Sequence, residues 1–125
     1  MKLSIIVVIT DPDKRQDPWK ESIKSFLELA DEVVIVNGGR KNFYEDIYNE
    51  FNFSDKLTIV NYEWPHIWGW DELPKHLNAG LNYAKGDWVI RCDIDYIWHE
   101  DVIPNIKQIL KLADDFPVAN FQKYS

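Results

Sequence analysis

The chain has a single cysteine, no long apolar run and no evident signal peptide, and each of these absences excludes a class of protein. Its single cysteine, Cys92, excludes a disulfide within the chain, which suits a reducing cytoplasm. No apolar run approaches the roughly 20 residues that a membrane-spanning helix needs. The apolar residues 3–9 are followed by Asp11-Pro12-Asp13 and by no small-residue cleavage site, so no signal peptide is evident. We therefore expect a cytoplasmic protein, with no membrane segment in this chain.

Basic residues are also too few for a nucleic-acid-binding surface. The sequence has 14 Lys and Arg against 21 Asp and Glu, a net charge of −7. Neither nucleic acid nor an anionic lipid surface is therefore an expected partner. Apolar residues, in contrast, make up 46% of the chain, and six of them are tryptophans, which is typical of a packed globular protein. The length of 125 residues predicts one domain over residues 1–125.

Strand and helix patterns alternate along the chain. Strands are predicted at residues 3–9, 32–36, 57–60, 87–92 and 118–121. Helices are predicted at 18–30 with Asp17 as N-cap, at 42–51, from the N-cap Asp71 to Ala84 with Gly86 as C′ residue, and at 102–113. This order predicts an α/β fold, a doubly wound and mostly parallel sheet with helices on both faces.

In such a sheet, ligands bind outside the carboxyl ends of the strands. The polar residues at those ends are Thr10, Asp11, Asn37, residues 61–63, Asp93 and Asp95. In an extended backbone, side chains two residues apart project to the same side, so Asp93 and Asp95 are placed to share one Mg²⁺ or Mn²⁺ with a substrate diphosphate. On spacing alone, a pair of loop aspartates that cap the next helix remains an equal alternative.

The run from Asn78 to Val89, followed by Asp93-Ile94-Asp95, resembles the core of the family 2 glycosyltransferases. Their pattern is Asn-x-Gly, then Ala-x-Gly-Asp/Glu-aromatic, a hydrophobic strand and Asp-x-Asp. Residues 4–8 and 32–37 also match the first two strands of that family. The resemblance implies the Rossmann-like GT-A fold, which binds nucleotide-diphosphate sugars. It also implies metal-assisted transfer of the sugar to an acceptor hydroxyl, with the sugar and the acceptor unspecified.

The resemblance further implies roles at the end of each strand. Asp95 would bind the divalent metal, Mn²⁺ or Mg²⁺, and Asp93 would contact the ribose or the water shell of the metal. Thr10 and Asp11 would line the nucleobase pocket, with a UDP-sugar favoured over a GDP-sugar. Asn37 stands where the family usually has an aspartate that reads the base, and an amide can both donate and accept there.

On the third helix, the resemblance places Asn78 at the start of the Asn-x-Gly motif. The family often has a basic residue immediately before that asparagine, whereas this chain has Leu77, with Lys75 and His76 as the nearest substitutes. Lys75 would neutralise a phosphate, and a solvated helix lysine is the alternative.

The aromatic loop and His99 each allow two interpretations. Trp64, Trp68 and Trp70 either stack on a sugar ring or pack beneath their loop. His99 either adds a metal ligand near Asp95 or caps a helix. The three histidines show no metal-binding spacing with each other or with the cysteine.

An inverting glycosyltransferase also needs a carboxylate base for the acceptor hydroxyl, and no residue here is identified as that base. Asp114 and Asp115 lie at a helix end, away from the predicted edge. We therefore expect the donor-binding part of a GT-A domain, incomplete at its C-terminus and inactive in transfer by itself. A strand at 118–121 would leave an open sheet edge, which favours a homodimer.

Two other functions compete with this interpretation. One is a nucleotide-sugar-binding module without catalysis of its own. The other is a phospho-accepting receiver domain, which is similarly short, acidic and doubly wound. That fold needs an aspartate at the end of its third strand, where this chain has Asn61.

Overall fold

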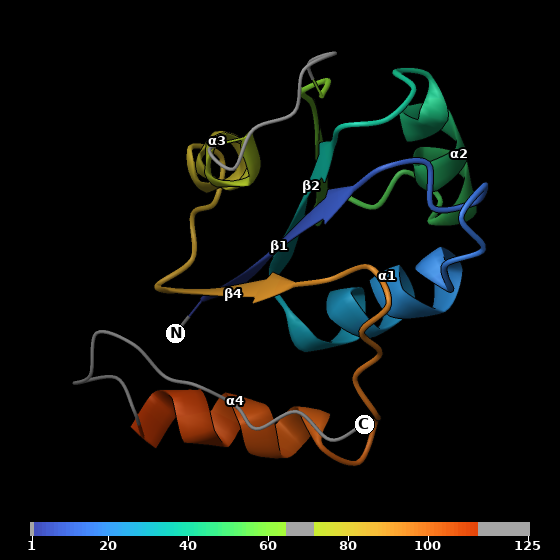
Figure 1. The fold of residues 1–125 in the computed structure, drawn as a ribbon. Helices are drawn as coiled ribbons and strands as arrows, with labels where there is room; N and C mark the ends of the chain where they lie inside the picture. The colour runs from blue at the N-terminus through green and yellow to red at the C-terminus, as the bar shows by residue number, and fades with distance from the viewer. Residues whose placement is uncertain (1, 65–71, 113–125) are drawn as a thin grey trace.

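The computed structural model describes residues 2–64 and 72–112, and these form a parallel sheet flanked by helices (Figure 1). The strands are β1 (Leu3–Ile9), β2 (Glu32–Asn37), β3 (Leu57–Asn61) and β4 (Trp88–Cys92). The helices are α1 (Trp19–Leu29), α2 (Phe43–Glu50), α3 (Glu72–Leu81) and α4 (Ile103–Leu112). The predicted strand at 118–121 and the predicted N-cap Asp71 lie outside the described residues.

The sheet has the order β3-β2-β1-β4, and all three neighbouring pairs are parallel. Parallel strands need a crossover connection, and a helix lies between each strand and the next along the chain. The register pairs Ile9 with Asn37 and Asn37 with Asn61, so these three strand ends lie in one row. The mostly parallel α/β fold predicted from the alternating patterns is therefore confirmed.

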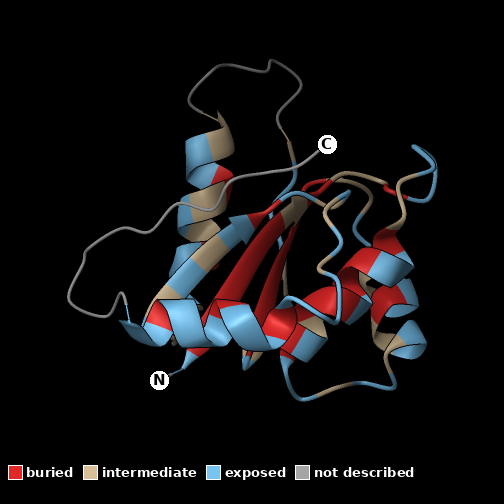
Figure 2. Ribbon diagram, turned by 90° about the horizontal axis from the view of Figure 1, so that it is seen from below, coloured by how far each residue is buried: buried red, intermediate tan, exposed pale blue. Residues whose placement is uncertain are grey.

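The central strands β1 and β2 are almost entirely apolar because both faces of the sheet are covered there, whereas the edge strand β4 exposes Val89 and Arg91. One face packs against α1, α2 and α4, and its core includes Ile5, Ile23 and Phe26, all fully buried. The other face packs against α3 through a smaller cluster around Ile6, Val34 and Val36. Figure 2 shows buried residues along the central strands and exposed residues on the outer sides of the helices.

Two of the predicted helix caps differ from the structure. The N-cap of α1 is Pro18 and makes no side-chain cap hydrogen bond, so the prediction of Asp17 as N-cap is wrong. The Asp17 carboxylate instead lies 3.8 Å from Nε of Arg15, and an ion pair competes for the oxygen that a cap would need. Helix α3 ends at Leu81, three residues before Ala84, so Gly86 is not its C′ residue.

Gly86 has a different role, because it lies against the amino end of β1. A Cβ atom there would come within 2.7 Å of the Ser4 backbone nitrogen and 2.8 Å of the Trp88 carbonyl oxygen. Backbone atoms cannot move aside cheaply, so only glycine fits this approach. Within residues 2–64 and 72–112, no helix is long and apolar enough to cross a membrane.

Candidate functional site

The parallel strands end at one edge of the sheet, and the predicted donor-binding residues of β1 and β2 are close together there. Nε1–H of Trp64 donates to Oγ1 of Thr10 across 2.6 Å. The backbone N–H of Arg40 donates to Oδ1 of Asp11 across 2.9 Å, and Gly38 N–H donates to the Ile9 carbonyl across 2.9 Å. The structure thus joins the segments after β1, β2 and β3 through direct hydrogen bonds.

Asn37 is fully buried at the end of β2, and its amide is used within the protein. Its Nδ2 donates to the Arg40 carbonyl and to Oδ1 of Asn61, both across 3.0 Å. Its Oδ1 accepts from the Gly39 N–H across 3.1 Å. The side chain therefore holds the turn after β2 against the end of β3. Its role as the residue that reads the base stays a prediction, because the amide is fully buried and bonded within the protein.

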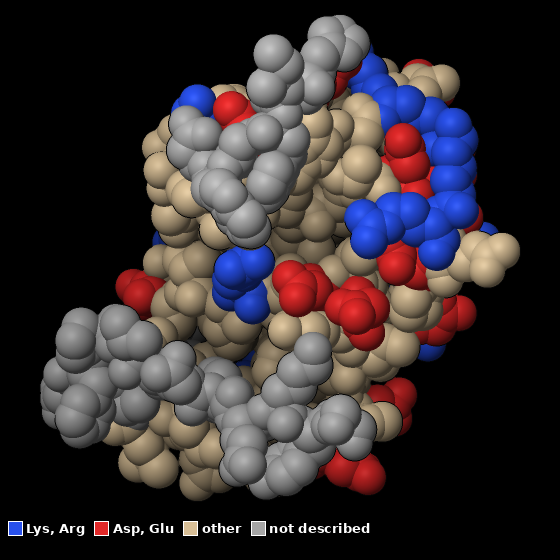
Figure 3. All heavy atoms as spheres, viewed as in Figure 1, with Lys and Arg blue, Asp and Glu red and all other residues tan. Residues whose placement is uncertain are grey.

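Arg40 forms the centre of a mixed-charge cluster that sequence reasoning missed. Its guanidinium contacts Oδ1 of Asp11 across 3.1 Å and Oδ2 of Asp13 across 2.5 Å, and Asp46 lies at 4.0 Å. Figure 3 shows basic and acidic side chains intermingled over the side of the molecule that carries α2. One sequence feature could have predicted this cluster: a basic residue directly follows the Gly-Gly turn after one strand, and the loop 11–13 after the first strand is acidic.

The cluster fixes the loop after β1 against the turn after β2. Asp11 has a φ of 42°, the left-handed region that a residue with a side chain seldom adopts. A Cβ atom at Gly39 would come within 2.7 Å of the Asp11 backbone nitrogen, so glycine allows the two segments to meet. The hydrogen bond from Arg40 lowers the pKa of Asp13 from its ordinary value of 3.8.

We expect Arg40→Gln to lower the unfolding midpoint modestly at pH 7, because both Asp11 and Asp13 lose a charged partner. A lowered carboxyl pKa contributes stability that is present above the ordinary value of 3.8 and is lost as the pH falls through the lowered pKa. The difference between the unfolding midpoints of wild type and variant, measured by thermal denaturation, should therefore become smaller below that pH. Lys41→Gln, at the exposed next position, is the matched control. A difference that is constant from pH 7 to pH 2.5 would contradict this role of the ion pair.

Asp93 and Asp95 follow β4, but not in the extended geometry that the sequence suggested. The strand ends at Cys92, and the Tyr96 N–H donates to the Asp93 carbonyl across 3.0 Å, which closes a turn. The prediction that both carboxylates project from one side of a strand is therefore wrong in its geometry. Both side chains are exposed, and Asp93 lies 3.8 Å from Nη2 of Arg91.

These two carboxylates are the candidate metal ligands at this edge. Within the described ranges, no group of three or more His, Cys, Asp and Glu residues could hold a metal ion. Mg²⁺ and Mn²⁺ are nevertheless commonly bound by one or two carboxylates, with water and substrate phosphates as the remaining ligands. Two accessible oxygen donors in one turn fit that mode, so the donor set suits a metal that arrives with a nucleotide diphosphate.

Cys92 lies directly before this turn and is inert. Its side chain is buried at the end of β4, and burial raises the pKa of its thiol to about 12. A neutral thiol is neither a nucleophile nor a ligand for a hard cation.

Lys75 and Asn78 are both exposed on α3. Nζ of Lys75 lies 3.3 Å from Oε1 of Glu72. Lys75 also lines an open hollow of about 290 Å³ together with Glu72, Tyr62 and Glu63, beside the end of β3. Their predicted contacts with the donor stay predictions.

The aromatic residues between β3 and α3 are only partly described. Trp68 and Trp70 lie outside the described residues, whereas Trp64 is partly exposed and stacks on His76, with ring centres 3.7 Å apart. His76 is fully buried, and His99 is exposed in the loop before α4.

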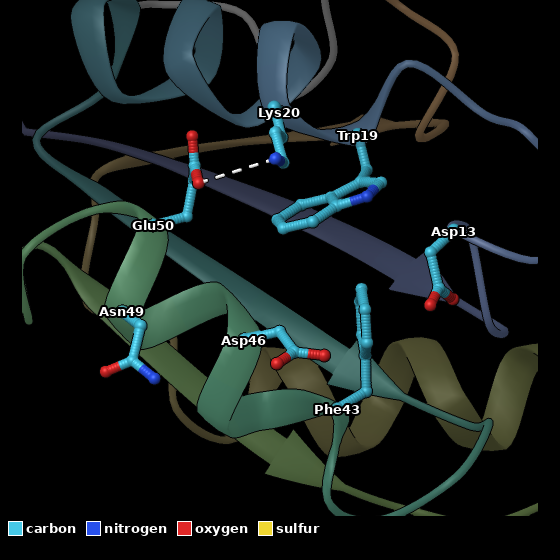
Figure 4. A pocket seen from close by; sticks show the side chains of 7 residues that line it. All are labelled: Asp13, Trp19, Lys20, Phe43, Asp46, Asn49 and Glu50. Atoms are coloured by element: carbon cyan, nitrogen blue, oxygen red, sulfur yellow. Dashed lines mark ion pairs between the residues drawn. The ribbon is translucent and has the colours of Figure 1, made fainter.

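A second hollow of about 350 Å³ lies between the beginning of α1 and one side of α2 (Figure 4). Its lining residues are Asp13, Trp19, Lys20, Phe43, Asp46, Asn49 and Glu50. Nζ of Lys20 lies 3.6 Å from Oε2 of Glu50, and the Trp19 and Phe43 rings meet edge to face at 5.2 Å. Both residues belong to the core, because only 9% of the surface of Trp19 and 1% of that of Phe43 is exposed. Neither ring is therefore accessible enough in this hollow to stack on a ligand.

Comparisons with known proteins agree with this fold. The model of glycosyl transferase family 2 matches residues 4–125. The bactoprenol glucosyl transferase of Shigella phage SfV is 30% identical over 122 residues, which cover 95% of this chain and 38% of that protein. The prophage bactoprenol glucosyl transferase homolog of Escherichia coli (strain K12) is 29% identical over 122 residues, covering 95% and 39%. The chain thus spans less than half the length of these relatives.

Among solved structures, S. aureus TarS 1–349 in complex with UDP-GlcNAc matches 90% of this chain and 32% of its own, with a TM-score of 0.66. At 21% identity, this likeness shows the fold alone, and that fold is GT-A. A complex of the same TarS fragment with UDP matches equally well. The receiver-domain alternative is thereby excluded, and the chain belongs to glycosyl transferase family 2.

Proposed function

We propose that this chain is the donor-binding part of a glycosyltransferase that takes a sugar from a UDP-sugar. The observation that carries the proposal is that Thr10, Asp11, Asn37 and Asp93 end or follow neighbouring parallel strands at one sheet edge, in a chain of this family. The names of the relatives favour glucose as the sugar and bactoprenol as the acceptor. The TarS complexes favour uridine as the nucleoside.

Each residue has a defined task in this proposal. Thr10 and Asp11 line the base pocket. Asn37 lies at its floor, where nucleotide binding must expose the buried Oδ1 before it can contact the base. Asp93 and Asp95 hold a divalent metal on the diphosphate, and Lys75 leaves Glu72 to neutralise a phosphate. Asn78 contacts the donor from α3.

The chemistry follows from the charge of the leaving group. When bound, the metal would offset the negative charge that develops on the leaving diphosphate as the bond to the sugar breaks. The acceptor hydroxyl also needs a base, and no carboxylate among the described residues is assigned to that task. We therefore expect no sugar transfer from this chain alone. A nucleotide-sugar-binding module without catalysis is the second candidate, favoured by the same observation.

Isothermal titration of the chain with UDP, ADP and inorganic pyrophosphate in the presence of Mn²⁺ tests the proposal. UDP should bind at least about tenfold more tightly than pyrophosphate, because the base and ribose add contacts worth about 1.4 kcal/mol or more. UDP should also bind more tightly than ADP. Equal affinity for all three ligands, or no binding by the folded chain, would contradict the proposal.

A further inference from the structure

Trp64 lies across the carboxyl ends of two strands. Its backbone N–H donates to the Gly38 carbonyl across 3.2 Å, so Trp64 follows the line of β3 alongside the turn after β2. Its indole N–H reaches past β2 to Oγ1 of Thr10, across 2.6 Å. A Cβ atom at Gly38 would overlap Nε1 and Cδ1 of the indole, so the ring occupies the space directly over that glycine.

The indole is also fixed from the side of α3. The His76 ring stacks on it at 3.7 Å between ring centres and 22° between planes. His76 in turn is fully buried, and its Nδ1 lies 2.8 Å from the Glu72 carbonyl, to which it donates. Tyr62 meets the same imidazole edge to face at 4.5 Å. The hydrogen bond to Thr10, the stack on His76 and the contact with Gly38 together leave the indole one position.

That position bounds the proposed base pocket. Thr10 and Gly38 are the residues that follow β1 and β2 at the edge where the nucleotide would bind. An indole has the same fused five- and six-membered ring frame as a purine, so it fills a volume comparable to that of a purine base. A pocket closed by this ring has correspondingly less depth for a second fused ring.

We propose that Trp64 is a specificity-determining residue that limits the depth of the base pocket, so that a single-ring base enters and a purine is excluded. The inference rests on the proposed function and adds to it the origin of the preference for uridine. Trp64 acts by its volume, and His76 is a positioning residue that holds the indole in place.

The test compares UDP with GDP, each titrated with Mn²⁺ into wild type, Trp64→Ala and Trp64→Phe. The Ala variant should gain GDP binding, so that the ratio of the UDP and GDP affinities falls at least about tenfold. The Phe variant retains one ring for the stack on His76 and should give an intermediate ratio of the two affinities. It also tests the inference if the Ala variant does not fold. Trp88→Ala, at the amino end of β4, is the matched control and should retain the wild-type ratio.

The outcomes separate the inference from the proposed function. Wild type that binds neither nucleotide overturns the proposed function and this inference with it. A second outcome overturns the inference alone: wild type binds UDP, and both Trp64 variants keep the wild-type ratio of the UDP and GDP affinities. Equal tightening of UDP and GDP in the Trp64 variants also overturns it, because the indole would then occupy the place of the base instead of bounding it.

Discussion

Asp95→Ala should remove the metal dependence of UDP binding. In wild type we expect Mn²⁺ to raise the affinity for UDP by about tenfold or more, because a metal between carboxylate and diphosphate supplies charge-assisted contacts worth roughly 1.5–3 kcal/mol. Asp95 is exposed in the turn after β4, so its truncation leaves the core intact. Titration calorimetry with Mn²⁺ and with EDTA measures the increment directly.

Two further variants complete this experiment. Asp93→Ala should weaken UDP binding with and without metal if Asp93 contacts the ribose, and only with metal if it holds the water shell. Asp55→Ala, exposed before the amino end of β3, should behave as wild type. A full metal increment in Asp95→Ala would remove Asp95 from the metal site.

Asn37→Ala should have the largest effect on stability among the candidate site residues. The change leaves the Gly39 N–H, the Arg40 carbonyl and Oδ1 of Asn61 without their shared partner. Loss of such a buried amide costs about 2 kcal/mol or more in the free energy of unfolding. Urea denaturation measures this loss, and Asn82→Ala, exposed after α3, is the matched control.

The same variant tests the predicted base contact. If Asn37 reads the base, Asn37→Ala should lose about 1 kcal/mol or more of UDP binding while pyrophosphate binding is unchanged. If Asn37 only orders the turn, UDP and pyrophosphate should weaken by similar factors. Wild-type stability together with wild-type UDP affinity would contradict both roles.

The sequence predicted the elements well because each one has a local pattern. The apolar run at residues 3–9 and the helical spacing of Trp19, Ile23 and Phe26 appear in the structure as β1 and as the buried side of α1. The carboxyl edge also followed from the strand order alone. Caps and turns were less predictable, because an ion pair at Asp17 and a turn after Cys92 depend on competing interactions within a few residues.

Contacts between distant segments could not be predicted from local patterns. The hydrogen bond between Asn37 and Asn61 spans 24 residues, and the one between Thr10 and Trp64 spans 54. Each depends on the register of parallel strands, which the sequence does not specify directly. The Arg40 cluster is similar, because the turn after β2 must meet the loop after β1 before the charges can pair. For this reason, the residues at the edge could be predicted from the sequence, but the contacts between them could not.

We expect a UDP–metal complex to bind at the carboxyl edge, with its metal at the turn after β4. Paramagnetic broadening of the backbone amide resonances by Mn²⁺, in the presence of UDP, locates the metal most directly. We predict that broadening centres on Asp93 and Asp95 and extends to Thr10 and Gly38, and that it disappears in Asp95→Ala. Broadening centred on Asp46 and Glu50, at the hollow between α1 and α2, would contradict the account.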